Sequence, residues 1–129
     1  MKIHTLSVPV QDQQHALEFY KEKLQFEVKE DVLVGNGHRW LTMVAAEQKE
    51  GPQILLEPMA FEPAKVYQKA LYDSNIAYTQ FEVQDIKAEY ERLTKLRVKF
   101  IVAPQEMGPA ILAIFDDTCG NYIQLFQLK

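Results

Sequence analysis

The sequence holds few side chains that could carry out acid–base, nucleophilic or metal chemistry. Its three histidines are His4, His15 and His38, and none belongs to a His-x-x-His or Glu-x-x-His pair that could hold a metal. His4 shares one face of a strand-like segment with Leu6 and Val8, so we expect a partly buried structural histidine there. For His15 we predict a solvated helix surface, and for His38 a turn position.

Two further residues are candidates for catalysis. Cys119 lies in a predicted turn with no histidine near it in the sequence, which disfavours a thiol nucleophile. Glu57 ends a strand-like segment and would suit a general base if its surroundings were closed and apolar. A plain surface carboxylate is the alternative interpretation of Glu57.

The dipeptide Arg39-Trp40 could bind a planar, acidic ligand. An indole ring stacks on planar molecules, and a guanidinium group forks onto a carboxylate. The sequence has a single tryptophan, and such a residue is also common in the core or at an interface of a small domain. Both interpretations of Trp40 stay open at this point.

Hydrophobic periodicity predicts the elements that must position these side chains. Alternating apolar residues favour strands at 3–10, 26–33, 39–45, 53–57, 76–83, 98–102, 110–115 and 122–128. Apolar residues at helical spacing favour helices at 13–24, 64–72 and 86–96. We expect Asp12 and Asp85 to cap the first and third of these helices.

The two halves of the chain repeat one pattern. Val10-Gln11-Asp12 matches Val83-Gln84-Asp85, and each motif is followed by a helix and then by three strands. The repeat predicts an α+β fold of paired βαβββ modules that form a cup-shaped mixed sheet with the helices outside. We expect a single domain over residues 1–129, with module one at about 1–57, a connector at 58–75 and module two at about 76–129.

Composition narrows the partners and the compartment. The net charge of −4, without a Lys/Arg cluster among aromatic residues, argues against nucleic acid and against a membrane surface as partners. We see neither a membrane span nor a signal peptide, and the lone cysteine cannot form an internal disulfide. We therefore expect a cytoplasmic protein that binds small molecules or proteins.

Two separated motifs within this repeat resemble the vicinal-oxygen-chelate superfamily. The first is Val10 to Phe26, with Val-Gln-Asp, Ala-Leu-Glu-Phe-Tyr and Leu-Gln-Phe in that order. The second is Phe115-Asp116-Asp117 followed by Gly120-Asn121-Tyr122-Ile123-Gln124-Leu125. The superfamily comprises glyoxalase I, bleomycin-resistance and fosfomycin-resistance proteins and extradiol dioxygenases. The resemblance spans nearly the whole chain and implies the paired βαβββ fold with its cup, whereas function differs among the members.

The resemblance also implies where a metal would be held. Enzymes of the superfamily place ligands, usually His and Glu, on the cup face of the first and last strands of each module. Here those positions fall on Thr5, Tyr78, Gln124, and either Glu57 or Leu55. At most one of these is a good ligand for Zn, Ni, Mn or Fe, so we predict no catalytic metal. A divalent metal held by an unexpected set, such as His4 with Glu57, is the alternative.

The alternation around these positions predicts a polar and aromatic cup for a small organic ligand. The ligand-binding candidates are Thr5, Ser7, Trp40, Glu57, Tyr78, Gln80, Tyr122 and Gln124, with Glu57 as the candidate catalytic residue. Glu82 and Phe126 share this face. We predict a glyoxalase/bleomycin-resistance-like protein that binds a small organic molecule and forms a homodimer through its sheet edges. The alternatives are a metal-dependent lyase, isomerase or dioxygenase of the same superfamily and a non-catalytic protein-interaction module.

Overall fold

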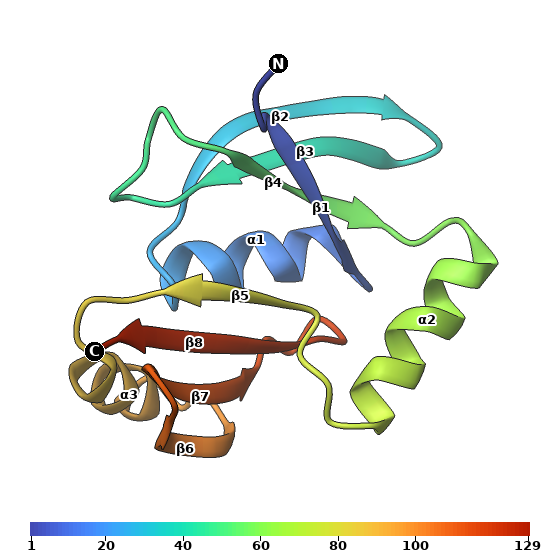
Figure 1. Cartoon of the computed structure of the whole chain (residues 1–129). Coiled ribbons are helices and arrows are strands. Elements are labelled where there is room, and N and C mark those ends of the chain that lie inside the picture. Colours follow the sequence, from blue (N-terminus) through green and yellow to red (C-terminus); the bar gives the residue numbers. More distant parts are fainter. The chain divides into compact units, whose positions relative to one another are not determined.

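Each half of the chain forms a four-stranded sheet with a helix packed on it (Figure 1). The structure, a computed structural model, describes all 129 residues. The helices are α1 (Gln13–Glu22), α2 (Glu62–Asp73) and α3 (Ile86–Lys95). The strands are β1 (Thr5–Val10), β2 (Glu27–Gly35), β3 (His38–Val44), β4 (Gln53–Pro58), β5 (Thr79–Glu82), β6 (Phe100–Met107), β7 (Ala110–Asp116) and β8 (Tyr122–Leu128).

The two sheets have the same connectivity. Their strand orders are β1-β4-β3-β2 and β5-β8-β7-β6, and in each the first strand runs parallel to the last strand of its module. The other neighbours are antiparallel. This confirms the α+β fold of paired βαβββ modules that the internal repeat predicted.

Both predicted helix caps are confirmed. The Asp12 side chain accepts a hydrogen bond from the backbone N–H of His15 at 3.0 Å, and Asp85 accepts one from Ala88 at 3.1 Å. α1 ends two residues before the predicted boundary, because the chain turns through Gln25 in the left-handed conformation, at φ 62°.

Other elements also begin or end at residues that differ from the prediction, and β6, β5 and α2 differ most clearly. β6 runs on to Met107, since it pairs with β7 along its length through two register shifts. β5 is shorter than expected and starts at Thr79, although the N–H of Tyr78 still bonds to the carbonyl of Tyr122 at 2.8 Å. α2 is longer than predicted at both ends.

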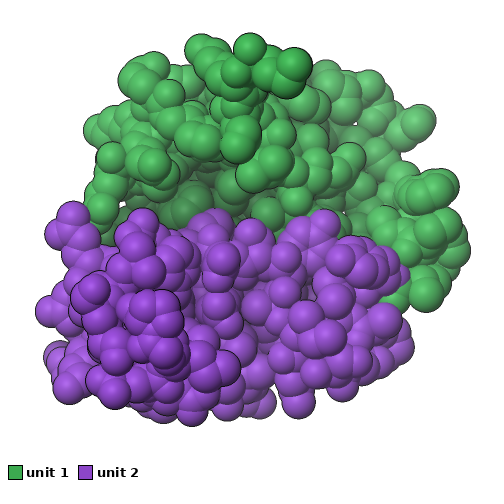
Figure 2. Space-filling model, in the orientation of Figure 1, with its two compact units in different colours: residues 1–66 green, residues 67–129 purple.

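The chain divides into two compact units, residues 1–66 and 67–129, which Figure 2 colours separately. In the first unit α1 packs on β4 and β2, and in the second α3 packs on β6, β7 and β8. The fully buried residues include Tyr20, Leu41 and Leu56 in the first unit, and Phe115 and Ile123 in the second. Each sheet therefore has a face covered by a helix of its own unit.

A buried polar network shapes the turn between β7 and β8. The Asp117 carboxylate is fully buried and accepts hydrogen bonds from the backbone N–H groups of Cys119 and Asn121 and from the Asn121 side chain. The buried Gln68 amide of α2 donates to Asn121 Oδ1 at 3.0 Å. A Cβ at Gly120 would lie 2.6 Å from the Gln68 side chain, so a glycine is needed here. The pair Asp116-Asp117 thus belongs to turn chemistry.

Candidate functional site

One face of the first sheet carries half of the predicted ligand-binding residues. Strand pairing aligns Ser7 with Leu55, and Thr42 with the same Leu55, so these residues of β1, β3 and β4 point to one side. We call this side, opposite α1, the Trp40 face. Its residues include Thr5, Ser7, Glu30, Trp40, Thr42, Gln53, Leu55 and Glu57.

Trp40 is the aromatic centre of this face. Its indole Nε1 donates a hydrogen bond to Glu30 Oε2 at 2.7 Å, which fixes the orientation of the ring. Trp40 nevertheless keeps 38% of its surface exposed. An exposed ring held in one orientation is suited to stack on a planar molecule, because little conformational entropy is lost on binding.

Two buried side-chain atoms on the Trp40 face lack a hydrogen-bond partner. They are Oγ1 of Thr42, a fully buried residue, and Oε1 of Gln53, which is 8% exposed. Such atoms are rare in folded proteins, since an unpaired buried polar group costs about 1–3 kcal/mol. The Thr42 hydroxyl can donate and accept, whereas the Gln53 oxygen can only accept. A bound molecule or water could satisfy both atoms.

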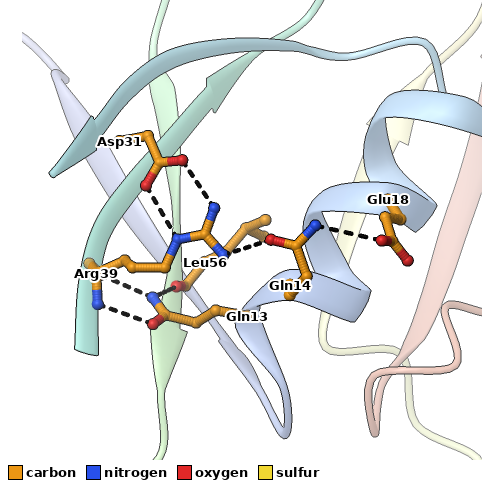
Figure 3. Close-up of polar contacts among 6 residues, drawn as sticks. All are labelled: Gln13, Gln14, Glu18, Asp31, Arg39 and Leu56. Carbon is orange, nitrogen blue, oxygen red and sulfur yellow. Dashed lines mark hydrogen bonds and ion pairs between the residues drawn. The ribbon is translucent and has the colours of Figure 1, made fainter. Parts of the chain in front are cut away.

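Arg39 lies on the opposite side of the same sheet, away from the Trp40 face. Its guanidinium group binds both carboxylate oxygens of Asp31, at 3.0 and 2.7 Å, and donates to Gln14 Oε1 (Figure 3). The hydrogen bond from Arg39 holds the pKa of Asp31 below its usual value. The suggestion that Arg39 acts with Trp40 on an acidic ligand is therefore wrong, because neighbouring strand residues point to opposite faces.

The second sheet has a comparable face, which we call the Tyr122 face. Its residues include Tyr78, Gln80, Glu82, Tyr122, Gln124 and Phe126, and strand pairing aligns Gln80 with Gln124 and Glu82 with Phe126. The Gln124 amide donates to Gln80 Oε1 at 2.8 Å. The structure thus brings the other four predicted binding residues together on this face.

Tyrosines of α2 pack against the Tyr122 face. The rings of Tyr72 and Tyr122 stack with centroids 4.3 Å apart, and Tyr67 contacts Tyr78 edge to face. The Tyr72 hydroxyl donates to Asp116 Oδ2 at 2.7 Å, and this hydrogen bond raises the pKa of Tyr72. Aromatic side chains therefore already occupy part of this face.

The Tyr72 hydrogen bond predicts a stability difference that depends on pH. Because the folded-state pKa is raised, its stabilisation is complete below the unfolded pKa of about 10 and is lost as the pH rises above it. We expect Tyr72→Phe to cost about 1 kcal/mol near neutral pH. The difference in the free energy of unfolding between wild type and variant should become smaller above pH ~10. Urea unfolding at a series of pH values measures this difference. A gap that stays constant across this range would contradict the assignment.

The register also decides which residue of β4 occupies the superfamily's metal-ligand position. Leu55 pairs with Ser7 as Gln124 pairs with Gln80, so Leu55 is the counterpart of Gln124. Glu57 lies two residues further along, opposite Pro9, and is exposed. The positions are therefore Thr5, Leu55, Tyr78 and Gln124. Hydroxyl, alkyl, phenol and amide groups do not fit a catalytic divalent metal.

The alternative pair of His4 and Glu57 is not brought together. His4 precedes β1 at the end where its carbonyl accepts from the N–H of Gln53, whereas Glu57 pairs with Pro9 near the other end. His4 and the position opposite Glu57 are therefore five residues, or ~16 Å, apart along β1. Neither unit gathers three or more His, Cys, Asp or Glu side chains at one point.

Sequence reasoning missed Glu30, Thr42 and Gln53 on the Trp40 face. Period-two alternation would have found Thr42 and Gln53, since each lies two residues from a predicted site residue or its partner. Glu30 had no such signal, because a register shift between Val28 and Glu30 sets its direction. Cys119, weighed as a nucleophile, is 1% exposed in the β7–β8 turn.

Known proteins resemble this chain over nearly its whole length. The family model described as the Glyoxalase/Bleomycin resistance protein/Dioxygenase superfamily matches residues 2–125. YurT of Bacillus subtilis (strain 168) is 48% identical over 127 residues, which cover 98% of this chain and 99% of YurT. YetH of the same organism is 29% identical over 124 residues, which cover 96% of each chain.

Solved structures share the fold. The crystal structure of UcmS2 matches with a TM-score of 0.83 and 29% identity, over 98% of this chain and 97% of UcmS2. TnmS3, an antibiotic binding protein from Streptomyces sp. CB03234, matches with a TM-score of 0.77 and 24% identity, over 100% of this chain and 97% of TnmS3. At that identity the likeness to TnmS3 concerns the fold alone.

Proposed function

This chain belongs to the Glyoxalase/Bleomycin resistance protein/Dioxygenase superfamily, the vicinal-oxygen-chelate group, and from that premise we propose that it binds a small organic molecule without a catalytic metal. The ligand is planar and carries polar substituents, and it stacks on Trp40. The donor set at the metal-ligand positions supports binding without a metal, since it offers no imidazole and no carboxylate.

The arrangement around Trp40 carries this proposal. The indole is exposed and held by Glu30, and the buried Thr42 hydroxyl two residues along the same strand face lacks a partner. An aromatic surface beside an unsatisfied hydroxyl suits a ring with a hydroxyl or carbonyl substituent. The fold is compatible with such a role, because TnmS3, which shares it, is an antibiotic binding protein.

Fluorescence of Trp40 tests the proposal directly, because it is the only tryptophan in the chain. We would titrate the protein with hydroxylated naphthalenes and flavones and follow quenching, and then measure the same ligands calorimetrically with Trp40→Ala. We expect saturable quenching in the wild type and about tenfold or greater weakening in the variant. Glu30→Gln is the matched control, since its amide oxygen still accepts the indole hydrogen bond. Equal affinity of wild type and Trp40→Ala would refute the proposal.

Thr42→Val should separate stability from binding. Valine has nearly the shape of threonine, and it removes a buried hydroxyl that lacks a partner, so we expect the variant to gain about 1 kcal/mol in urea unfolding. If the hydroxyl bonds to the ligand, the affinity of the same variant should fall by about fivefold to tenfold. A destabilised variant would indicate that Thr42 already has a partner in the folded protein.

Glu57 distinguishes binding from catalysis. Its side chain is exposed on the Trp40 face, so a catalytic role remains a prediction that depends on a ligand closing over it. Glu57→Gln should change ligand affinity only modestly if the protein is a binder. Loss of turnover in lyase, isomerase and dioxygenase assays with that variant would instead favour the enzyme alternative.

A homodimer and a cytoplasmic location are further parts of the proposal. The edge strand β2 is exposed along its whole length and presents Val32, Leu33 and Val34, which favours a protein partner such as a second copy. Light scattering after size exclusion measures the oligomeric state. No helix of the structure is long and apolar enough to span a membrane.

A further inference from the structure

A cavity of about 340 Å³ lies at the end of the first sheet where β1 and β4 begin. Its lining includes Lys2, His4, Lys29, Lys49, Glu50 and Gln53. We call it the lysine cavity. The lysine cavity lies away from Trp40. Gln53 of β4 is displaced from Trp40 of the neighbouring strand β3 by about four residues along the strands, or ~13 Å.

The lysine cavity is positive in a protein that is negative overall. Three ammonium groups and one carboxylate line it, whereas the whole chain carries a net charge of −4. Lys49 forms an ion pair of 3.4 Å with Glu27, but Lys2 and Lys29 form no ion pair. Unpaired cations that converge on a concave surface attract an anion.

Gln53 adds a second, independent requirement. Its side chain is buried, and its Oε1 atom has no hydrogen-bond partner. This oxygen can only accept a hydrogen bond, so it is satisfied by a molecule that has an O–H or N–H group to donate. A bare anion has no proton to donate, whereas a hydrogen phosphate or a hydroxy acid has one.

We propose that the lysine cavity binds a small oxyanion that also carries a hydroxyl donor, with the charge facing Lys2 and Lys29 and the hydroxyl donating to Gln53 Oε1. This chemistry is shared by hydrogen phosphate, by the monoanion of a phosphate monoester and by a hydroxycarboxylate. The lysine cavity shares only Gln53 with the Trp40 face and uses neither Trp40 nor Thr42, so its failure would leave the proposed function untouched.

The proposal can be tested with pairs of anions of which one carries a hydrogen-bond donor and the other does not. We would titrate the isotope-labelled chain of 129 residues with inorganic phosphate and with sulfate at neutral pH, and follow amide NMR shifts of Lys29, Gly51 and Gln53. Sulfate matches the hydrogen phosphate dianion in size and charge but has no O–H group to donate a hydrogen bond. Glycolate and acetate form the same pair for carboxylates, so the stronger pair identifies the class of oxyanion.

We expect phosphate or glycolate to bind about tenfold more tightly than its partner without a donor, with saturable shifts confined to the lysine cavity. Gln53→Leu should abolish this preference while keeping or raising stability, since it removes an unpartnered buried oxygen. Lys29→Gln should weaken both anions of a pair by about threefold to fivefold. Lys87→Gln, the same change on exposed α3, is the matched control.

Equal affinity for both members of each pair would overturn the role of Gln53. Shifts scattered over surface lysines outside the cavity, or an equal loss in Lys29→Gln and Lys87→Gln, would overturn the site itself. If Gln53→Leu failed to fold, the two lysine variants and the wild-type comparison of phosphate with sulfate would still decide the matter.

Discussion

Asp117→Ala should be among the most destabilising single substitutions in this protein, lowering the free energy of unfolding by about 3–5 kcal/mol. The carboxylate is fully buried and accepts three hydrogen bonds, from the N–H groups of Cys119 and Asn121 and from the Asn121 amide. Alanine would leave these donors buried without a partner. Asn121 also bonds to Gln68, so the loss would spread to the contact between α2 and the turn.

Urea unfolding measures this effect, with Asp117→Asn and Asp73→Ala as companions. Asparagine keeps the shape but replaces one acceptor oxygen by an amide, so we expect an intermediate loss of about 2 kcal/mol. Asp73 forms only an exposed ion pair with Lys69, and its removal should cost less than about 0.5 kcal/mol. If Asp117→Ala and Asp73→Ala were equally stable, the network would contribute nothing to folding.

Gln13→Ala should have the second large effect, a loss of about 2–3 kcal/mol. The buried Gln13 side chain joins the first turn of α1 to two strands (Figure 3). Its amide donates to the carbonyls of Arg39 and Leu56 at 2.7 and 2.8 Å, and its Oε1 accepts from the N–H of Arg39 at 2.9 Å. Alanine would leave all three backbone groups without this partner.

The neighbouring Gln14 supplies a matched control for that experiment. Gln14 is exposed and bonds to the side chains of Arg39 and Glu18 rather than to the backbone. We expect Gln14→Ala to cost no more than about 0.5–1 kcal/mol in urea unfolding. Amide hydrogen exchange at Arg39 should accelerate only in Gln13→Ala. Faster exchange in both variants would mean that the contacts of the Arg39 side chain, and not the Gln13 amide, protect the backbone N–H of Arg39.

Much of the fold could be predicted from the sequence because its signals are local or repeat. Asp12 and Asp85 mark helix starts by their own side-chain chemistry, and apolar alternation marks the strands whichever strands they pair with. The repeat of Val-Gln-Asp then gave the connectivity of both modules. Alternation also placed Thr5 with Ser7, and Tyr122 with Gln124, on shared faces.

Contacts between residues far apart in the sequence could not be predicted in this way. Gln13 is a polar residue at the start of a helix, and nothing in the local pattern marks it as buried, yet it is buried because its amide bonds to the backbone of β3 and β4. The choice between Leu55 and Glu57 likewise required the pairing of β1 with β4. Neither contact leaves a periodic trace in the sequence, since each depends on which strands are neighbours.

The sequence by itself determined the modules, the helix caps and the alternation of the strands, whereas its suggestion that Arg39 and Trp40 act together was wrong. Only the tertiary structure decided which side chains Trp40 and Arg39 contact. The register shift at Lys29 in β2 turns Glu30 toward Trp40 and Asp31 toward Arg39. An unbroken strand would have exchanged those two carboxylates, because a shift of one residue moves every following side chain to the other face of the sheet.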